Sequence, residues 1–578
     1  MNPSFMICIV LLQTGFALLP RPGRDETLAL DPQPHLLRRH CLNGDCTPGR
    51  PRVYNLTISR GFSAPDGVNS SMILVNGAFP GPTLEANIGD KFIIHVNNQI
   101  SDPEGTALHW HGFYQKDTPW MDGVPSVTMC PIAPGHSFTY EFKADRVGIS
   151  WWHSHYSAQT AGGLFGAMIV HGPLPYDFDI DIGPILLSDH FHFDFRDMVS
   201  GTLRGQIVYS SNNLINGKMR FNCSTIPPTG PSCSPTAGIS KFRFQSGKIH
   251  LLRLINAAAE ALQHFSIDGH NLTVVALDYV PVKAYQTTVI TLSPGQRADI
   301  LVSANHWSNS SFWMRSDVDP TCSGSNQPHA LAAVYYEAAN TYKDPTTTAI
   351  KYTTGDCVAQ PLWRTEPLIP KSISSRAPDY IQVLNNTLEP NATGTLQFMT
   401  NGKQFRANYS QSLLVMANRN QNQSAAPAVQ WDPLSNVYDF GENKTIRLVL
   451  YNYFVSPHPM HLHGHDFFII GEGRGSWDGK VQGRNITNPM RRDTHQMIGA
   501  APDGTPSYLV LQMELDNPGV WAFHCHISQH LVLGMYLNIV YQEKRIRQLK
   551  IPVKIGESCE VWRNFTNRTT FQQPDSGL

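Results

Sequence analysis

The sequence contains few charged residues and has no excess of either sign. Charged side chains make up 15% of the 578 residues, with 44 Lys and Arg against 45 Asp and Glu. A protein that binds nucleic acid or an anionic membrane through charge needs a basic surplus, so this balance argues against both partners. Beyond residue 20 no segment is apolar enough for a membrane-spanning helix, and no long stretch keeps a helical period. We therefore expect a soluble chain, and a monomer by default.

Turn-forming residues, in contrast, are abundant, with 44 Gly and 42 Pro. They favour many short strands joined by turns over long helices. Residues 84–100 and 248–260 have the composition of strands with short connections. A chain of this length is too long for a single core and suits two to four domains. We predict an all-β protein.

The N-terminal residues are typical of an export signal. An apolar run from Phe5 to Leu19 is too short to span a bilayer comfortably, although a buried N-terminal strand is an alternative. We expect residues 1–20 to be a signal peptide and the basic residues 21–49 to include a propeptide. Dense Asn-x-Ser/Thr sequons also predict a secreted glycoprotein; they begin at Asn55, Asn69, Asn222, Asn271, Asn309, Asn385, Asn391, Asn408, Asn422, Asn443, Asn485, Asn564 and Asn567.

The ten cysteines fit an extracellular protein with disulfide bonds. Cys8 lies in the expected signal peptide and Cys525 lies in a histidine motif, which leaves eight for four bridges. Proximity in the sequence favours three local pairs and one that joins distant parts of the chain. These pairs are Cys41 with Cys46, Cys223 with Cys233, Cys322 with Cys357, and Cys130 with Cys559. The sequence alone leaves other connectivities open.

Four short motifs carry residues suited to metal chemistry. Together they hold ten histidines and one cysteine, in His109-Trp110-His111-Gly112, Trp152-His153-Ser154-His155, His458-Pro459-Met460-His461-Leu462-His463, and His524-Cys525-His526 followed by His530 and Met535. Residues i and i+2 of a strand point to the same face, so each His-x-His pair can direct two imidazoles at a shared metal cluster. One such pair is weak evidence, but four in one secreted chain predict a metal centre.

The cysteine motif predicts a second kind of site. His524 and His526 face one side of a strand, so Cys525 must face the other. A thiolate there, with His530 and the distant His458, makes a two-histidine, one-cysteine site, and Met535 can supply a weak axial contact. That ligand set is the one expected for a blue electron-transfer copper. The backbone would also link the Cys525 thiolate to both flanking histidines.

The four motifs, read as HWHG, WHSH, HPMHLHGH and HCHISQH, resemble those of the multicopper oxidase family, and within it the ascomycete-type fungal laccases. The likeness covers nearly all of the chain after about residue 50. It implies three consecutive cupredoxin-like Greek-key β-domains and four copper ions. It also implies one-electron oxidation of phenols at the blue copper and four-electron reduction of dioxygen to water at a three-copper cluster.

The resemblance assigns each ligand. It implies a blue (type 1) copper held by His458, Cys525 and His530, with Met535 axial. A single type 2 copper would be held by His109 and His461. One of the paired type 3 coppers would be held by His111, His153 and His526, and the other by His155, His463 and His524.

Three further features follow from the same resemblance. Glu260 matches a carboxylate of the laccase substrate pocket, where it would accept the phenolic proton as the electron leaves. Asp122 matches an aspartate that supports the type 2 copper and relays protons. The C-terminal residues Asp575-Ser576-Gly577-Leu578 match a chain end that plugs a channel to the three-copper cluster.

The motif positions predict the domain organisation. We expect a first domain at 50–174, a second without metal at 175–345 that shapes the substrate pocket, a linker at 346–376, and a third domain at 377–578. Met535 departs from the Leu or Phe of many fungal laccases and predicts a lower potential.

Three alternatives within the family remain open at this point. They are a specialised phenol-coupling oxidase of pigment or polyketide biosynthesis, an ascorbate oxidase, and a metal-oxidising relative. A non-catalytic copper-binding protein is the alternative from another class, although no Met-rich or His-rich tract supports it.

Overall fold

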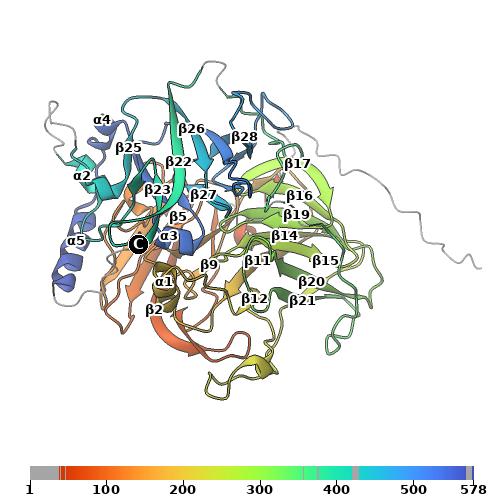
Figure 1. The fold of residues 1–578 in the computed structure, drawn as a ribbon. Coiled ribbons are helices and arrows are strands. Elements are labelled where there is room, and N and C mark those ends of the chain that lie inside the picture. The colour runs from red at the N-terminus through yellow and green to blue at the C-terminus, as the bar shows by residue number, and fades with distance from the viewer. Residues whose placement is uncertain are drawn as a thin grey trace, which may run out of the picture.

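The computed structural model describes residues 38–39, 41–45, 47–353, 355, 357–373, 377–419, 429–567 and 576–578. The expected signal peptide, most of the expected propeptide, Cys8, Cys46, Asn422 and Asp575 lie outside these residues. Strands dominate the described chain, and they form three successive pairs of sheets, coloured orange, green and blue along the chain in Figure 1. This architecture confirms the all-β prediction and the three cupredoxin-like domains.

The first pair of sheets precedes residue 172. One sheet has the order β3-β2-β5-β7 and the other β4-β9-β8-β6. Their bounds are β2 Pro51–Ser63, β3 Ser70–Val75, β4 Leu84–Asn87, β5 Lys91–Asn98, β6 Leu108–Trp110, β7 Ser137–Lys143, β8 Gly148–Ser154 and β9 Phe165–His171. A two-stranded sheet of β1 (Arg38–Arg39) and β10 (Pro173–Leu174) follows at the edge of this domain.

The second pair of sheets has the orders β12-β11-β14-β19-β16-β17 and β13-β21-β20-β15-β18. Their bounds are β11 Ile180–His190, β12 Asn212–Ile215, β13 Lys241–Phe244, β14 Ile249–Asn256, β15 Gln263–Ile267, β16 Leu272–Leu277, β17 Val280–Thr287, β18 Ile290–Leu292, β19 Arg297–Ser303, β20 Ser311–Val318 and β21 His329–Tyr336.

The third pair has the orders β24-β23-β22-β26-β31-β28-β29 and β25-β33-β32-β27-β30. Their bounds are β22 Tyr380–Pro390, β23 Leu396–Thr400, β24 Lys403–Gln404, β25 Val437–Asp439, β26 Thr445–Asn452, β27 His458–Leu462, β28 Phe467–Arg474, β29 Arg491–Arg492, β30 Thr494–Met497, β31 Ser507–Glu514, β32 Gly519–Cys525 and β33 Tyr536–Tyr541.

One pairing scheme recurs in all three domains. The long first strands β2, β11 and β22 each pair antiparallel with the strand that follows (β3, β12, β23) and parallel with a later one (β5, β14, β26). The facing sheets repeat a parallel pair of their own, β4 with β9, β13 with β21, and β25 with β33. The repetition of one topology indicates three copies of the same fold.

The helices are few, and all but α5 have nine residues or fewer. They are α1 Phe195–Leu203, α2 Leu413–Asn418, α3 Ser528–Val532, α4 Glu543–Ile546 and α5 Val553–Thr566, with single 3-10 turns at Leu42–Gly44, Pro119–Met121, Cys223–Thr225 and Pro433–Ser435. A bridge between Cys130 of the first domain and Cys559 on α5 joins residues 429 positions apart. The predicted pairs Cys223 with Cys233 and Cys322 with Cys357 are also present. The predicted partner of Cys41 is Cys46, which lies outside the described residues.

Burial distinguishes ordinary strands from those that carry the histidine motifs. β5 alternates between buried and more exposed residues, as expected for a strand with one face against the core. β8 and β32 are buried at every position because one face packs in their own domain and the other lies against a neighbouring domain. The motif strands therefore meet where the first and third domains meet.

Candidate copper centres

The four motifs lie on paired strands. In the first domain β6 runs antiparallel to β8, so that His109 is opposite His153. In the third domain β27 runs antiparallel to β32, so that His461 is opposite His524. Each motif therefore presents its histidines beside those of its partner strand.

Eight histidines from both domains gather at one buried place. Each is at most 7% exposed; they are His109, His111, His153, His155, His461, His463, His524 and His526. Rings from different domains approach closely, with centroids 3.8 Å apart for His111 and His461 and 4.0 Å apart for His109 and His463. The interface between the domains therefore builds one cluster that neither domain contains alone.

The arrangement of their nitrogens fits metal binding. Five ring nitrogens are buried without a hydrogen-bond partner: Nε2 of His109, Nδ1 of His111, Nε2 of His153, Nε2 of His461 and Nε2 of His526. Buried nitrogens of this kind are rare unless an ion or water binds them. Burial lowers the pKa of His111, His153, His461 and His526 far below the usual range, so these rings are neutral and offer a lone pair.

The predicted ligand sets are each brought together. Nε2 of His524 lies 3.0 Å from Nε2 of His463 and 3.3 Å from Nε2 of His155. The rings of His111 and His153 are each centred 5.1 Å from that of His526. His109 and His461 have centroids 5.9 Å apart. His109 is also close enough to share an ion with His111 and His153, so the division among individual ions stays a prediction.

The opposite nitrogens of several rings are held by hydrogen bonds that fix their orientation. Nδ1 of His109 donates to the backbone carbonyl of Asp122 at 2.8 Å, and Nδ1 of His463 donates to the carboxylate Oδ2 of Asp122 at 2.9 Å. Asp122 is fully buried between these two histidines from different domains. Nδ1 of His153 and of His524 donate to carbonyls at 2.9 Å in the same way. Such bonds set the tautomer that leaves the other nitrogen free for a metal.

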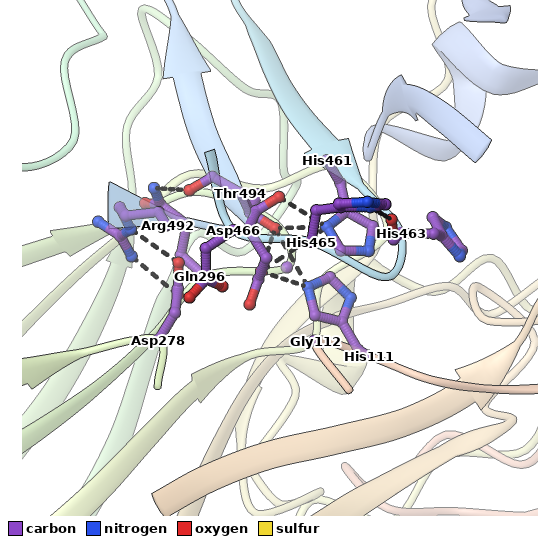
Figure 2. Close-up of polar contacts among 12 residues, drawn as sticks. His111, Gly112, Asp278, Gln296, His461, His463, His465, Asp466, Arg492 and Thr494 are labelled. Carbon is purple, nitrogen blue, oxygen red and sulfur yellow. Dashed lines mark hydrogen bonds and ion pairs between the residues drawn. The ribbon is translucent and has the colours of Figure 1, made fainter. Parts of the chain in front are cut away.

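Asp493 is a supporting residue that lies in none of the four histidine motifs. Its Oδ1 lies 3.2 Å from Nε2 of His111, and its carbonyl accepts from Nδ1 of His461 at 2.9 Å. Arg297 of the second domain binds both carboxylate oxygens at 2.6 and 2.7 Å. Figure 2 shows the surrounding network, with Thr494 beside His461 and Asp278 facing Arg492. No sequence signal marks this run of charged residues as buried.

The cysteine site lies on the opposite face of β32. Sγ of Cys525 is 3.4 Å from Nδ1 of His530 and 3.7 Å from Nδ1 of His458, and the two histidine nitrogens are 3.0 Å apart. Cys525 is buried and forms no disulfide. Burial raises the pKa of the Cys525 thiol and so favours its protonated form. A metal cation beside the sulfur would be needed to stabilise the thiolate. Two imidazoles and one thiolate suit copper.

Met535 lies next to this site. It is 1% exposed and belongs to the same hydrophobic cluster as Cys525. Its backbone N–H donates to the carbonyl of His530, and its carbonyl accepts from the N–H of Cys525. The backbone thus fixes Met535 beside both ligands, and an axial contact of its sulfur with copper remains a prediction.

A cavity of about 800 Å³ reaches the cysteine site from the surface, and both His530 and Glu260 line it. Burial of the Glu260 carboxyl, with a smaller contribution from the charge of Asp189, raises the pKa of Glu260 to about 8. Asp189 accepts the backbone N–H groups of residues 259–261 and so holds the loop that carries Glu260. Gln529 approaches Glu260 at 3.5 Å and directly precedes His530. Glu260 is predictable from the sequence resemblance, whereas Asp189 lies in none of the four histidine motifs and Gln529 stands in one without being an expected ligand.

The C-terminal residues lie against the histidine cluster. Leu578 lines a small cavity together with His153, His155, His524 and His526. The N–H of Gly577 donates to the carbonyl of Val532 at 2.7 Å, and the carbonyl of Gly577 accepts from the N–H of Ala407 at 3.0 Å. In Figure 1 this end lies beside α3. Two backbone hydrogen bonds therefore hold the end of the chain in place.

Comparison with known proteins identifies the family. Three domain models described as multicopper oxidase match residues 57–174, 181–339 and 378–545. The chain belongs to the multicopper oxidase family. It is therefore an oxidoreductase that uses copper, and the family decides against a non-catalytic copper-binding protein.

Relatives narrow the class within the family. The enzyme is 32% identical over 571 residues to dihydrogeodin oxidase of Aspergillus terreus, covering 92% of this chain and 91% of that one. It is 32% identical over 534 residues to Laccase-1 of Botryotinia fuckeliana, covering 91% and 88%. The crystal structure of the laccase from Botrytis aclada superposes with a TM-score of 0.83 at 30% identity, covering 93% and 96%. The oxidase is of laccase type, and no helix among its described residues has the length and apolarity needed to cross a membrane.

Proposed function

We propose that the enzyme is a secreted laccase that takes single electrons from phenols and reduces dioxygen to water. One observation carries the proposal: His530, a ligand of the cysteine site, and Glu260, a carboxyl with a raised pKa, line the same cavity. A phenol in this cavity meets an electron acceptor and a proton acceptor together. Glu260 receives the phenolic proton, because a phenol that loses an electron becomes a much stronger acid.

Four copper ions, distributed over the ligand sets given above, would accept electrons singly at Cys525 and deliver four to dioxygen at the histidine cluster. The chain's own residues provide the path, because Cys525 is linked through one peptide bond each to His524 and His526. Asp122 is buried against His109 and His463 and has its Oδ1 without a hydrogen-bond partner. This oxygen, 3.3 Å from Nδ1 of His109, is the proposed acceptor or donor of protons at the cluster.

We propose that the chain end closes this cluster to bulk water. Leu578 and the four histidines of the small cavity form its wall, and Gly577 is fixed by hydrogen bonds on both sides. A closed cluster keeps partly reduced oxygen from escaping. We also propose that the first domain ends at residue 174, the second at 345 and the linker to the third at 376.

Secretion is supported by the three described disulfides and by the sequons. None of the sequon asparagines in the described part of the chain is buried; those most exposed are Asn55, Asn69, Asn222, Asn271, Asn309, Asn408, Asn564 and Asn567. Each of these side chains is therefore open to glycosylation.

The test is oxygen consumption by the purified, copper-loaded enzyme with 2,6-dimethoxyphenol and, separately, with ascorbate. Uptake with the phenol, strong blue absorption and no hydrogen peroxide are the expected results. Uptake with ascorbate alone would contradict the proposal and favour an ascorbate oxidase.

A second candidate function is coupling of one specific phenol in a biosynthetic route. It is favoured by the likeness to dihydrogeodin oxidase, which is as extensive as the likeness to Laccase-1. A coupling enzyme would keep the same copper ligands and differ in the cavity wall. A panel of phenols decides between the two: a laccase oxidises many of them, whereas a coupling enzyme converts few and gives one dimeric or cyclised product.

A further inference from the structure

A further His-x-His pair lies in the second domain, away from the copper centres. His190 ends β11 and His192 follows it, while Asp66 lies in the loop between β2 and β3 of the first domain. One ring nitrogen of each histidine and one carboxylate oxygen of Asp66 all lie within 4.8 Å of one another. The three residues therefore form a compact donor cluster between two domains.

The cluster is buried and has an unused nitrogen. Asp66 is 0% and His190 3% exposed, and Nε2 of His190 is buried without a hydrogen-bond partner. Buried nitrogens without a partner are uncommon and indicate a missing water or ion. The side chain of His192 is 13% exposed, which gives a ligand from solvent a way in.

The donors are held in place by residues that would remain bonded when a metal is present. Oδ1 of Asp66 accepts from the N–H of Val68 at 3.1 Å, and Oδ2 accepts from Nδ2 of Asn212 at 2.9 Å. The loop itself is fixed, because the N–H of Asn69 donates to the carbonyl of Ser232 and the carbonyl of Gly67 accepts from the N–H of Ser234. A donor set held this rigidly needs little rearrangement to bind an ion.

Nε2 of His192 lies 2.8 Å from Oδ2 of Asp66, which on its own describes an ordinary His–Asp hydrogen bond. The copper centres show the same contacts between their own donors. Nδ1 of His458 and Nδ1 of His530 lie 3.0 Å apart, and Nε2 of His458 has no partner. Crowded donors beside an unpartnered ring nitrogen are thus the form that a metal site takes in this structure.

We propose that Asp66, His190 and His192 bind a divalent transition-metal ion of the zinc type, in addition to the copper of the two centres. Two imidazoles and one carboxylate suit Zn²⁺ with a water at the fourth position, whereas Ca²⁺ and Mg²⁺ prefer oxygen ligands alone. Cu²⁺ would bind the same donors more tightly than Zn²⁺. The ion links the first domain to the second. This proposal departs from the prediction that the second domain holds no metal, and it does not depend on the proposed laccase activity.

The test counts metal ions in the full-length, copper-loaded protein. Loosely bound metal is removed with a weak chelator, the protein is dialysed against micromolar ZnCl₂, and copper and zinc per chain are measured by mass spectrometry. We expect the wild type to hold one ion more than Asp66→Asn and than His190→Gln. The ratio of zinc to copper shows which ion fills the site. Zinc should also raise the Tm of the copper-loaded wild type and leave the Tm of the copper-loaded variants unchanged.

A matched control comes from the same domain. Nε2 of His264 lies 3.1 Å from Oδ2 of Asp319 and Nδ1 lies 2.8 Å from Oγ1 of Thr291, so this buried histidine has no nitrogen left for a metal. His264→Gln should keep the wild-type ion count.

Equal counts in the wild type and both variants, with unchanged blue absorption, would overturn the proposal and leave an ordinary His–Asp pair. If Asp66→Asn fails to fold, His190→Gln decides alone, because Nε2 of His190 has no hydrogen bond to lose.

Discussion

Asp189 accepts the backbone N–H of Glu260 at 2.8 Å. This hydrogen bond keeps the two carboxylates close together beside the cavity that His530 and Glu260 line. Asp189 also accepts the N–H groups on either side and is itself buried. Its charge disfavours a second charge on Glu260 and thereby raises the pKa of Glu260 beyond the effect of burial. Asp189 therefore both positions Glu260 and contributes to its raised pKa.

Replacing Glu260 by Gln should lower kcat/KM for phenols by about a hundredfold to ten-thousandfold, because the amide fills the same space and cannot accept the phenolic proton. Oxidation of ferrocyanide, which loses no proton, should change little. The measurement is steady-state oxygen uptake with both donors. Glu442→Gln, at an exposed position, is the control and should behave as the wild type. Equal losses with both donors would show that Glu260 has no role specific to proton transfer.

The same carboxyl predicts a pH dependence. Glu260 accepts a proton only when ionised, and its pKa is about 8, so phenol oxidation should rise with pH up to that region. Asp189→Asn removes a neighbouring negative charge, lowers the pKa of Glu260 and should move the rising limb to lower pH by up to about one unit. Profiles of kcat/KM for a phenol and for ferrocyanide provide the test. A shift seen with ferrocyanide as well would assign the effect to another group.

Much of the metal chemistry could be predicted from the sequence, because strand periodicity fixes it locally. His524, Cys525 and His526 must alternate between the two faces of a strand whatever the rest of the fold does. The structure accordingly places Cys525 beside His458 and His530, and the flanking histidines in the cluster on the other side.

Residues that act across domain interfaces could not be predicted in this way. Asp493 lies 382 positions from His111, and its burial depends on Arg297 of another domain. His190 and His192 form a His-x-His pair that can be found in the sequence. Asp66, the third residue of the proposed site, is 126 positions from His192. Spacing along one strand carries no information about a partner on a separate domain.

Asp493→Asn should weaken copper binding in the histidine cluster. The carboxylate holds the ring of His111 and balances the charge of Arg297, and removal of such supporting groups typically costs about tenfold to a hundredfold in metal affinity or activity. Copper analysis and the visible spectrum provide the measurement. The blue absorption of the cysteine site should persist, because Asp493 does not contact Cys525, His458 or His530. Loss of the blue band together with the cluster copper would instead indicate general unfolding.

Met535→Leu should raise the reduction potential of the blue copper, provided that the sulfur of Met535 is its axial ligand. A thioether donates electron density to the metal, and a leucine of similar volume does not. Redox titration followed at the blue absorption band measures the change. Met314, a fully buried methionine on β20 of the second domain, offers the control, and Met314→Leu should leave the potential as it is. An unchanged potential in Met535→Leu would place the sulfur outside the copper's coordination.

The bridge between Cys130 and Cys559 should stabilise the closed arrangement of the first and third domains. It closes a loop of 429 residues and anchors α5, whose Trp562 packs with Tyr156 close to His155. The double variant Cys130→Ser, Cys559→Ser should lose about 2–5 kcal/mol of stability. The change is measured as a lower Tm and as faster exchange of amide hydrogens in α5. Removing the local bridge between Cys223 and Cys233, which closes only 10 residues, is the control and should cost less. An equal loss of stability in both double variants would show that joining distant parts of the chain gives the long bridge no extra stabilising effect.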